Sequence, residues 1–127
     1  MTLRCVIVDD SPAVLRAASE LLEGEGMAVV GLAATSEEAV RLVEELHPDV
    51  VLIDIDLGPE SGLDLARRLV HAADSGGSRS ILISTHDEAD FAKPIEASPA
   101  IGFLPKADLS ATAIHQLLAG AQDDERY

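Results

Sequence analysis

The chain has 127 residues, of which 47% are hydrophobic, and its formal net charge is −14. This length suits one domain with a real core and leaves no room for a second one, such as a separate output module. The sequence pI near 4.4 argues against direct nucleic-acid binding, because such binding needs a basic surface. We attribute most of the acidity to solubility.

The start of the chain shows no signal peptide, and the sequence has no apolar run of about 18 residues that could cross a membrane. The single cysteine, Cys5, cannot form an internal disulfide. It lies in an apolar run, where a free cysteine usually behaves as a small buried hydrophobe. We therefore expect a cytoplasmic protein without membrane contact.

The first half of the chain alternates predicted strands and helices. A strand over residues 3–8 leads into a helix that Ser11 can cap, with Pro12 at the first helical position. A second strand over residues 27–33 precedes Thr35-Ser36-Glu37-Glu38, which is a capping box and opens the second helix. Pro48 ends that helix before the third strand.

The third strand is the most apolar one. Four consecutive apolar residues, 50–53, run into Asp54 and then into a turn at Gly58-Pro59. An apolar run without alternation is typical of a strand buried on both faces, as in a parallel sheet covered by helices. Asp54 therefore ends a buried strand. A third helix follows the turn, and residues 75–78 form a flexible loop.

The remaining elements complete the pattern. A fourth strand is predicted over residues 80–84, a fifth over 100–104, and Ser110 caps the last helix. Between these strands Pro94 and Pro99 make residues 87–99 a poor helix, so the fourth helix should be short, kinked, or start near Pro94. Five strand-helix units predict a doubly wound α/β fold. We place its one domain at residues 1–122 and an acidic C-terminal tail at 123–127.

Carboxylates follow two of the predicted strands. Asp9 and Asp10 come after the first, and Asp54 ends the third. Ligands of open α/β sheets bind at the carboxyl ends of strands, and clustered carboxylates repel each other unless a cation joins them. Mg²⁺ suits these oxygen ligands, and no His or Cys accompanies them as a zinc or copper site would require. Alternatively, Asp54 merely caps its turn.

Polar residues at successive strand ends carry a resemblance that spans essentially the whole chain. With Ser84 after the fourth strand and Lys106 after the fifth, these Asp residues resemble the site of receiver domains in bacterial two-component response regulators. Gly62 and Phe103 agree with this family. The resemblance implies a flavodoxin-like sheet of strand order 2-1-3-4-5 with five helices. The sequence around Asp54 and Lys106 is similar to that of receivers attached to helix-turn-helix output domains. An alternative is therefore that the chain is the receiver fragment of a DNA-binding transcriptional regulator.

The resemblance also implies roles for the site residues. Asp54 would accept a phosphoryl group from a sensor histidine kinase or a phosphotransfer protein. Asp10, Asp54 and the backbone carbonyl of Asp56 would hold Mg²⁺, with Asp9 acting directly or through water. Lys106 would stabilise the charge of the transferring group. Such a domain is a signalling device and not an enzyme with a turned-over substrate.

A hydroxyl and an aromatic side chain would link the site to the output surface. Ser84 would hydrogen-bond the phosphoryl group, although Thr85 also offers a hydroxyl, and strand alternation favours Ser84. His86 either influences how water reaches the phosphoryl group or is an ordinary loop histidine. Phe103 matches the switch aromatic of the family. The output would be an unknown downstream protein or a homodimer.

Two rival functions have weaker support. Asp54-Ile55-Asp56 resembles the nucleophile motif of haloacid-dehalogenase-type phosphatases, but Leu57 and Gly58 follow where those enzymes have a Thr or Val at a set position. A degenerate receiver that only binds partners is disfavoured because all five site residues are present.

Overall fold

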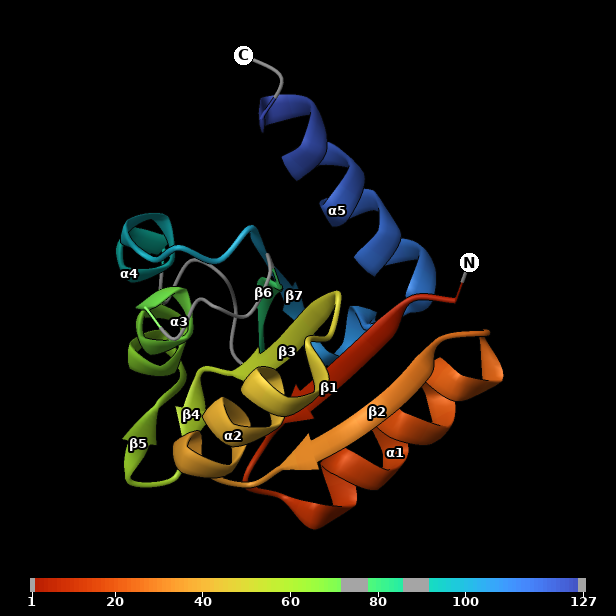
Figure 1. Ribbon diagram of the computed structural model, residues 1–127, viewed down its shortest axis with the longest axis horizontal. Helices are drawn as coiled ribbons and strands as arrows, with labels where there is room; N and C mark the ends of the chain where they lie inside the picture. The colour runs from red at the N-terminus through yellow and green to blue at the C-terminus, as the bar shows by residue number, and fades with distance from the viewer. Residues whose placement is uncertain (1, 72–77, 86–91, 126–127) are drawn as a thin grey trace.

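The computed structural model describes residues 2–71, 78–85 and 92–125. Its centre is a five-stranded parallel sheet of order β2-β1-β3-β6-β7 (Figure 1). The strands are β1 (Arg4–Val8), β2 (Ala28–Ala33), β3 (Val50–Asp54), β6 (Arg79–Ser84) and β7 (Gly102–Pro105). Counted within this sheet alone the order is 2-1-3-4-5, which confirms the predicted fold.

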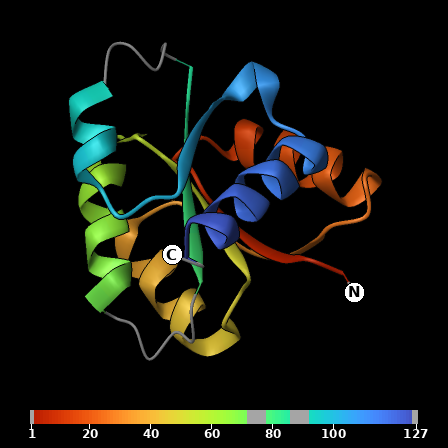
Figure 2. The ribbon, with the colours of Figure 1, turned by 90° about the horizontal axis from the view of Figure 1, so that it is seen from above.

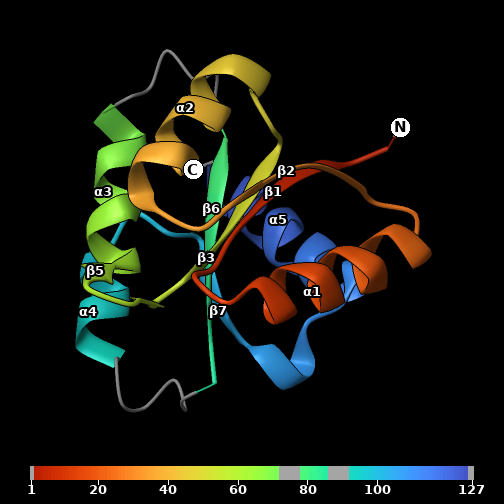
Figure 3. The ribbon, with the colours of Figure 1, turned by 90° about the horizontal axis from the view of Figure 1, so that it is seen from below.

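Helices cover both faces of the sheet, as Figures 2 and 3 show from opposite directions. One face carries α1 (Pro12–Gly24) and α5 (Ala111–Glu125), and the other carries α2 (Ser36–Leu46), α3 (Gly62–His71) and α4 (Ala92–Ala97). A small antiparallel hairpin of β4 (Asp56–Leu57) and β5 (Glu60–Ser61) follows β3, and a 3-10 helix, η2 (Lys106–Asp108), follows β7. None of the described helices is long and apolar enough to span a bilayer.

Burial of the central strands explains their unbroken apolar runs. Residues 50–53 of β3 have no exposed surface, because a hydrophobic cluster packs on each side of the sheet. Burying such side chains contributes roughly 1.5–3 kcal/mol each. Cys5 is equally buried, as predicted. Burial, with the charge of Glu23, raises the pKa of its thiol to about 12, so Cys5 stays a neutral core residue.

The predicted helix starts are confirmed by their caps. The Ser11 hydroxyl accepts a hydrogen bond from the Val14 N–H at 3.3 Å, and the Ser110 hydroxyl accepts one from Ala113 at 3.0 Å. Thr35 accepts from the Glu38 N–H at 3.2 Å. Each cap satisfies a backbone donor that the first turn of a helix leaves free.

Three elements refine the predictions. Helix α4 has six residues with Pro94 in its first turn, where the missing N–H costs nothing, so the prediction of a short helix is confirmed. In the predicted third helix, α3, Val70 is 50% exposed, whereas Leu65 is buried, because Leu65 shares a face with Leu69 one turn later. Helix α5 continues to Glu125, beyond the predicted start of the tail at 123. Most of the predicted loop, residues 75–77, lies outside the described residues.

Candidate functional site

Three carboxylates gather at the C-terminal edge of the sheet. Asp9 follows β1 and Asp54 ends the neighbouring strand β3. Carboxylate oxygens of Asp9, Asp10 and Asp54 lie within 4.8 Å of one another. Asp9 is 0% and Asp54 5% exposed, while Asp10 is exposed. The cluster is therefore buried at its base and open to solvent through Asp10.

Lys106 reaches the cluster from the end of β7. Its Nζ lies 2.7 Å from Oδ2 of Asp9 and 3.2 Å from Oδ2 of Asp54. Strand β6 lies between β7 and β3, and β1 lies on the far side of β3, so the long side chain extends past the end of β6 to contact Asp54 and reaches further to Asp9. The structure thus brings together the residues that the sequence placed at three strand ends.

Backbone N–H groups fix the two buried carboxylates in place. Oδ1 of Asp9 accepts a hydrogen bond from the Ser11 N–H at 2.9 Å, and Oδ1 of Asp54 accepts one from the Asp56 N–H at 3.1 Å. Such turns, in which an Asp side chain bonds the backbone two residues on, hold the carboxylate in one orientation. The Asp56 side chain is itself exposed, so only its backbone lies with the buried groups.

The charges of the site shift the pKa values of two groups. Burial and, after it, the negative charge of Asp9 raise the pKa of Asp54, and Lys106 opposes both effects, with the result that this pKa is about 6. Burial lowers the pKa of Lys106, but its hydrogen bonds to Asp9 and Asp54 and their charges outweigh this and leave it above the ordinary value. One lysine therefore does not fully compensate the three carboxylates.

The donor set suits a hard divalent cation. All three side chains offer oxygen atoms, and within the described part of the chain no His or Cys joins the cluster. Such a set selects Mg²⁺, Ca²⁺ or Mn²⁺ over softer metals. The buried carboxylates supply the reason for binding, because a cation would offset the burial and the repulsion by Asp9 that together raise the pKa of Asp54.

Two glycines let the chain pass close to the carboxylates. A Cβ on Gly62 would overlap the backbone carbonyl of Asp54, so only glycine fits there. Gly58 has a φ of +64° and sits at the tip of the β4–β5 hairpin, where a Cβ would lie 3.1 Å from Oδ2 of Asp10. The sequence singled out both glycines but did not show that Gly58 lies against Asp10.

The candidate hydroxyls and the aromatic residue occupy distinct places. Asp54 pairs with Ile83 in the sheet and Pro105 pairs with Ser84, so Ser84 lies between the strand ends of Asp54 and Lys106. Ser84 is buried and Thr85 is exposed. His86 lies outside the described residues. Phe103 is 8% exposed and belongs to the core cluster that Ile95 of α4 packs against.

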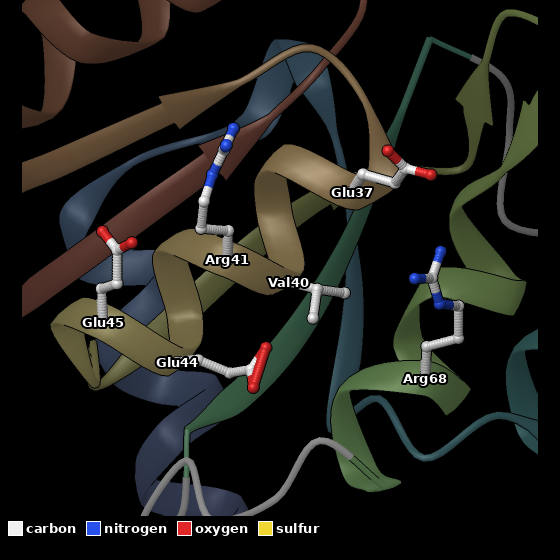
Figure 4. A pocket seen from close by; sticks show the side chains of 6 residues that line it. All are labelled: Glu37, Val40, Arg41, Glu44, Glu45 and Arg68. Carbon is white, nitrogen blue, oxygen red and sulfur yellow. The ribbon is translucent and has the colours of Figure 1, made fainter.

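Hollows also lie beside the three carboxylates and away from them. One, of about 400 Å³, is mostly apolar and is lined by nine residues, Val14, Ala17, Ala18, Leu21, Ile83, Thr85, Lys106, Ala107 and Leu109. Another lies between α2 and α3 and contains none of the predicted site residues (Figure 4). It is lined by Glu37, Val40, Arg41, Glu44, Glu45 and Arg68.

Comparison with known proteins gives a consistent result. The profile of the family described as "Response regulator receiver domain" matches residues 5–119. The chain is 29% identical to the response regulator GacA of Pseudomonas aeruginosa over 93% of its own length and 56% of that protein. It is 35% identical to the DNA-binding response regulator MtrA of Mycolicibacterium smegmatis, over 76% of this chain and 41% of the relative. The chain thus spans about half the length of these relatives.

Solved structures agree. A two-component response regulator of the LuxR family from Aurantimonas superposes with a TM-score of 0.83 at 32% identity, over 94% of this chain and 87% of that one. The receiver domain of a modulated diguanylate cyclase from Desulfovibrio desulfuricans superposes with a TM-score of 0.78 at 28% identity, over 99% and 98%.

A doubly wound sheet with clustered carboxylates and a lysine at its C-terminal edge defines the class of CheY-like signalling domains. The chain belongs to the response regulator receiver domain family, the family of two-component signal transduction. The resemblance seen in the sequence is thereby confirmed. One relative, a protein-glutamate methylesterase of Shewanella, is an enzyme by name, but the chain covers only 32% of its length.

Proposed function

We propose that Asp54 accepts a phosphoryl group, donated by a sensor histidine kinase or a phosphotransfer protein, and that the chain signals by this change. The observation that carries the proposal is the double contact of Lys106, whose Nζ meets Asp9 at 2.7 Å and Asp54 at 3.2 Å beside a third carboxylate. A positive group next to a buried nucleophile is the arrangement that phosphoryl transfer requires.

The acidic cluster would hold Mg²⁺ through Asp10, Asp54 and the backbone carbonyl of Asp56, with Asp9 as a direct or water-mediated ligand. Bound Mg²⁺ would draw negative charge from the phosphoryl oxygens. It would also favour the ionised form of Asp54, which is the form that attacks. The all-oxygen donor set and the uncompensated carboxylates support this choice of metal.

In the proposed reaction an oxygen of the Asp54 carboxylate forms a bond to phosphorus, and the bond from phosphorus to the donor's imidazole nitrogen breaks. That nitrogen keeps the electron pair and takes up a proton, so the donor leaves as neutral histidine. Lys106 would turn its ammonium from the carboxylates to the phosphoryl oxygens. Ser84, at the end of the strand between those of Asp54 and Lys106, would donate a hydrogen bond to the phosphoryl group.

Intact-protein mass spectrometry tests this proposal. With a small-molecule phosphodonor and Mg²⁺ we expect the wild type to gain one phosphoryl group, and Asp54→Asn to gain none, because an amide is not a nucleophile of this kind. Chelation with EDTA should abolish the labelling. Equal labelling of Asp54→Asn and the wild type, or labelling that persists in EDTA, contradicts the assignment.

An assay of phosphate release by the same purified protein distinguishes the receiver function from the phosphatase alternative. A haloacid-dehalogenase-like enzyme would hydrolyse a phosphate ester repeatedly, whereas a receiver loses only its own phosphoryl group. Steady release of phosphate from an added ester in excess over protein would favour the enzyme. For the output we propose a protein partner or self-association through α4, β7 and α5, since Phe103 of β7 packs in the cluster that contacts α4.

A further inference from the structure

A hydrogen bond joins the hairpin after the phosphoacceptor strand to the start of a distant helix. The Ser36 N–H donates to Oε1 of Glu60 at 3.0 Å, across 24 residues of sequence. Ser36 is the first residue of α2 and is buried. Its N–H is among those that a helix leaves without a partner, and the positive end of the helix dipole favours the carboxylate. Glu60 therefore caps α2 from outside, in addition to Thr35.

The Glu60 end of this bond is rigidly connected to the acidic site. Glu60 pairs with Leu57 in the β4–β5 hairpin, and Leu57 is anchored in the core. The hairpin begins with Asp56, whose N–H donates to the Asp54 carboxylate, and its tip at Gly58 lies against Asp10. Glu60 is therefore joined through one short hairpin to the Asp56 backbone and to the tip.

The Ser36 end is connected to the same site by a second route. The Asp9 N–H donates to the carbonyl of Ala33, the last residue of β2, at 3.0 Å. Only two residues separate Ala33 from Ser36. The Glu60–Ser36 hydrogen bond thus completes a chain of short connections from Asp9, through the start of α2 and the hairpin, to Asp54.

We propose that Glu60 is a positioning residue for the metal site and couples it to the N-terminus of α2. Glu60 holds the hairpin where the Asp56 carbonyl and the Asp10 carboxylate can serve one cation. This inference rests on the Mg²⁺ site of the proposed function. Coupling between two sites is reciprocal, so a cation that binds better when the Glu60–Ser36 hydrogen bond is formed also strengthens that bond.

The coupling reaches a surface that the phosphoacceptor does not touch. Arg68 of α3 lines a hollow together with Ser36 and Glu60. It also lines the neighbouring hollow between α2 and α3, in which Figure 4 shows it across from the side chains of α2. Glu37, in the first turn of α2, lines this second hollow, so a change at the N-terminus of α2 would alter its end.

Calorimetric titration of the full chain with Mg²⁺ tests the inference. For Glu60→Ala we expect the dissociation constant to rise about three- to tenfold, less than the 10–100-fold typical of a group that bonds a ligand directly. Glu60→Gln should stay near the wild type, because its amide oxygen still accepts from Ser36. Glu37→Ala, which removes an exposed charge from the first turn of α2, is the matched control and should also stay near the wild type.

A second variant removes the donor instead of the acceptor. Proline at position 36 has no N–H, is well tolerated at the first position of a helix, and follows a Thr35 that is already extended, with φ −134° and ψ 163°. Ser36→Pro should weaken Mg²⁺ binding as much as Glu60→Ala, and the double variant should bind no more weakly than either single one.

Hydrogen exchange of the Ser36 amide gives the reciprocal readout. In the wild type Mg²⁺ should slow this exchange, and in Glu60→Ala it should have no effect on it. Unchanged Mg²⁺ affinity in both Glu60→Ala and Ser36→Pro overturns the inference alone. A Glu60→Gln variant as weak as Glu60→Ala overturns it too, because charge and not the hydrogen bond then matters. A wild type that binds no Mg²⁺ overturns the proposed function and the inference together.

Discussion

Asp54 is subject to two opposing demands. As a nucleophile it must be ionised, yet burial and the neighbouring Asp9 carboxylate favour its protonated form and raise its pKa to about 6. Lys106 offsets part of this effect but contacts both carboxylates at once. A bound cation would resolve the conflict, since it favours the charged form of every ligand. In the metal-free protein the conflict should be visible as a dependence of stability on pH.

The folded protein holds the Asp54 proton more tightly than the unfolded chain, where the ordinary pKa is 3.8. The stabilisation that this tighter proton binding at Asp54 adds to the free energy of unfolding is therefore fully present below about pH 4 and is lost as the pH rises through about 6. The loss is at most about 3 kcal/mol, at roughly 1.4 kcal/mol for each pKa unit.

Urea unfolding in EDTA at a series of pH values measures this dependence. Asp54→Asn has no proton to lose and should be the more stable protein at pH 7, with a smaller fall between pH 4 and 6 than the wild type shows. Parallel pH profiles for the two proteins would show that Asp54 does not carry the effect.

The sequence alone reveals site residues that end an apolar run, but it does not reveal residues such as Glu60 whose only signal is a partner far away in the sequence. Asp9 follows and Asp54 ends a buried strand, and Lys106 follows the edge strand β7, so the C-terminal edge of the parallel sheet brings the three together. Glu60 has no such signal, because its partner Ser36 is 24 residues away. Ser84 was favoured over Thr85 by alternation, and its burial agrees with that choice, while its contact with a phosphoryl group stays a prediction.

Helix α5, on the other face of the sheet, also has a cap from a residue remote in the sequence. Oε1 of Glu25, just after α1, accepts a hydrogen bond from the Ala111 N–H at 2.6 Å. Ala111 is the first residue of α5, whose Ser110 cap serves the Ala113 N–H instead. Glu25 therefore satisfies a different donor and places a negative charge at the positive end of α5.

We expect Glu25→Ala to lower the free energy of unfolding by about 1 kcal/mol, the usual cost of losing a helix cap. Glu25→Gln keeps an acceptor and should cost less. Glu20→Ala, at an exposed position in α1, removes the same charge and should be close to neutral. Chemical denaturation followed by circular dichroism measures all three, and equal losses in Glu25→Ala and Glu20→Ala would contradict the capping role.

Elements differ in how much their own sequence reveals. Capping residues in the sequence predict the starts of three helices, at Ser11, Thr35 and Ser110, and prolines predict that α4 is short. The β4–β5 hairpin escaped prediction beyond its Gly58-Pro59 turn, because strands of two residues show no periodicity. The hairpin depends on tertiary contacts, chiefly the burial of Leu57 in the core and the hydrogen bond from α2 to Glu60.

Burial and connectivity predict the layers of the molecule, whereas the strand order is implied by the family resemblance. The unbroken apolar runs of β1 and β3 require cover on both faces, and right-handed crossovers then place α1 and α5 opposite the other three helices (Figure 3). The membership of the chain in the receiver family agrees with this reasoning. The apolar pattern of the sequence does not indicate which of these packed elements move when the site is occupied.

Helix α4 is the shortest of the described α-helices. Its six residues are fewer than an isolated helix needs, so its order depends on packing. Ile95 of α4 and Ala100 pack against the cluster that contains Phe103 of β7, and Phe103 is 8% exposed. An inward Phe103 therefore supports α4, and a change in the position of Phe103 would loosen it. Elements of low local stability are the ones that switch readily.

We expect occupation of Asp54 to shift an existing equilibrium in residues 86–106, of which 92–106 are described. Hydrogen exchange with Mg²⁺ and beryllofluoride, a phosphoryl mimic, should change amide protection in α4 and β7 of the wild type. Asp54→Asn, which lacks the carboxylate that the mimic needs, should show no change under the same conditions. Protection that stays the same throughout residues 86–106 of the wild type would mean that this segment transmits no signal.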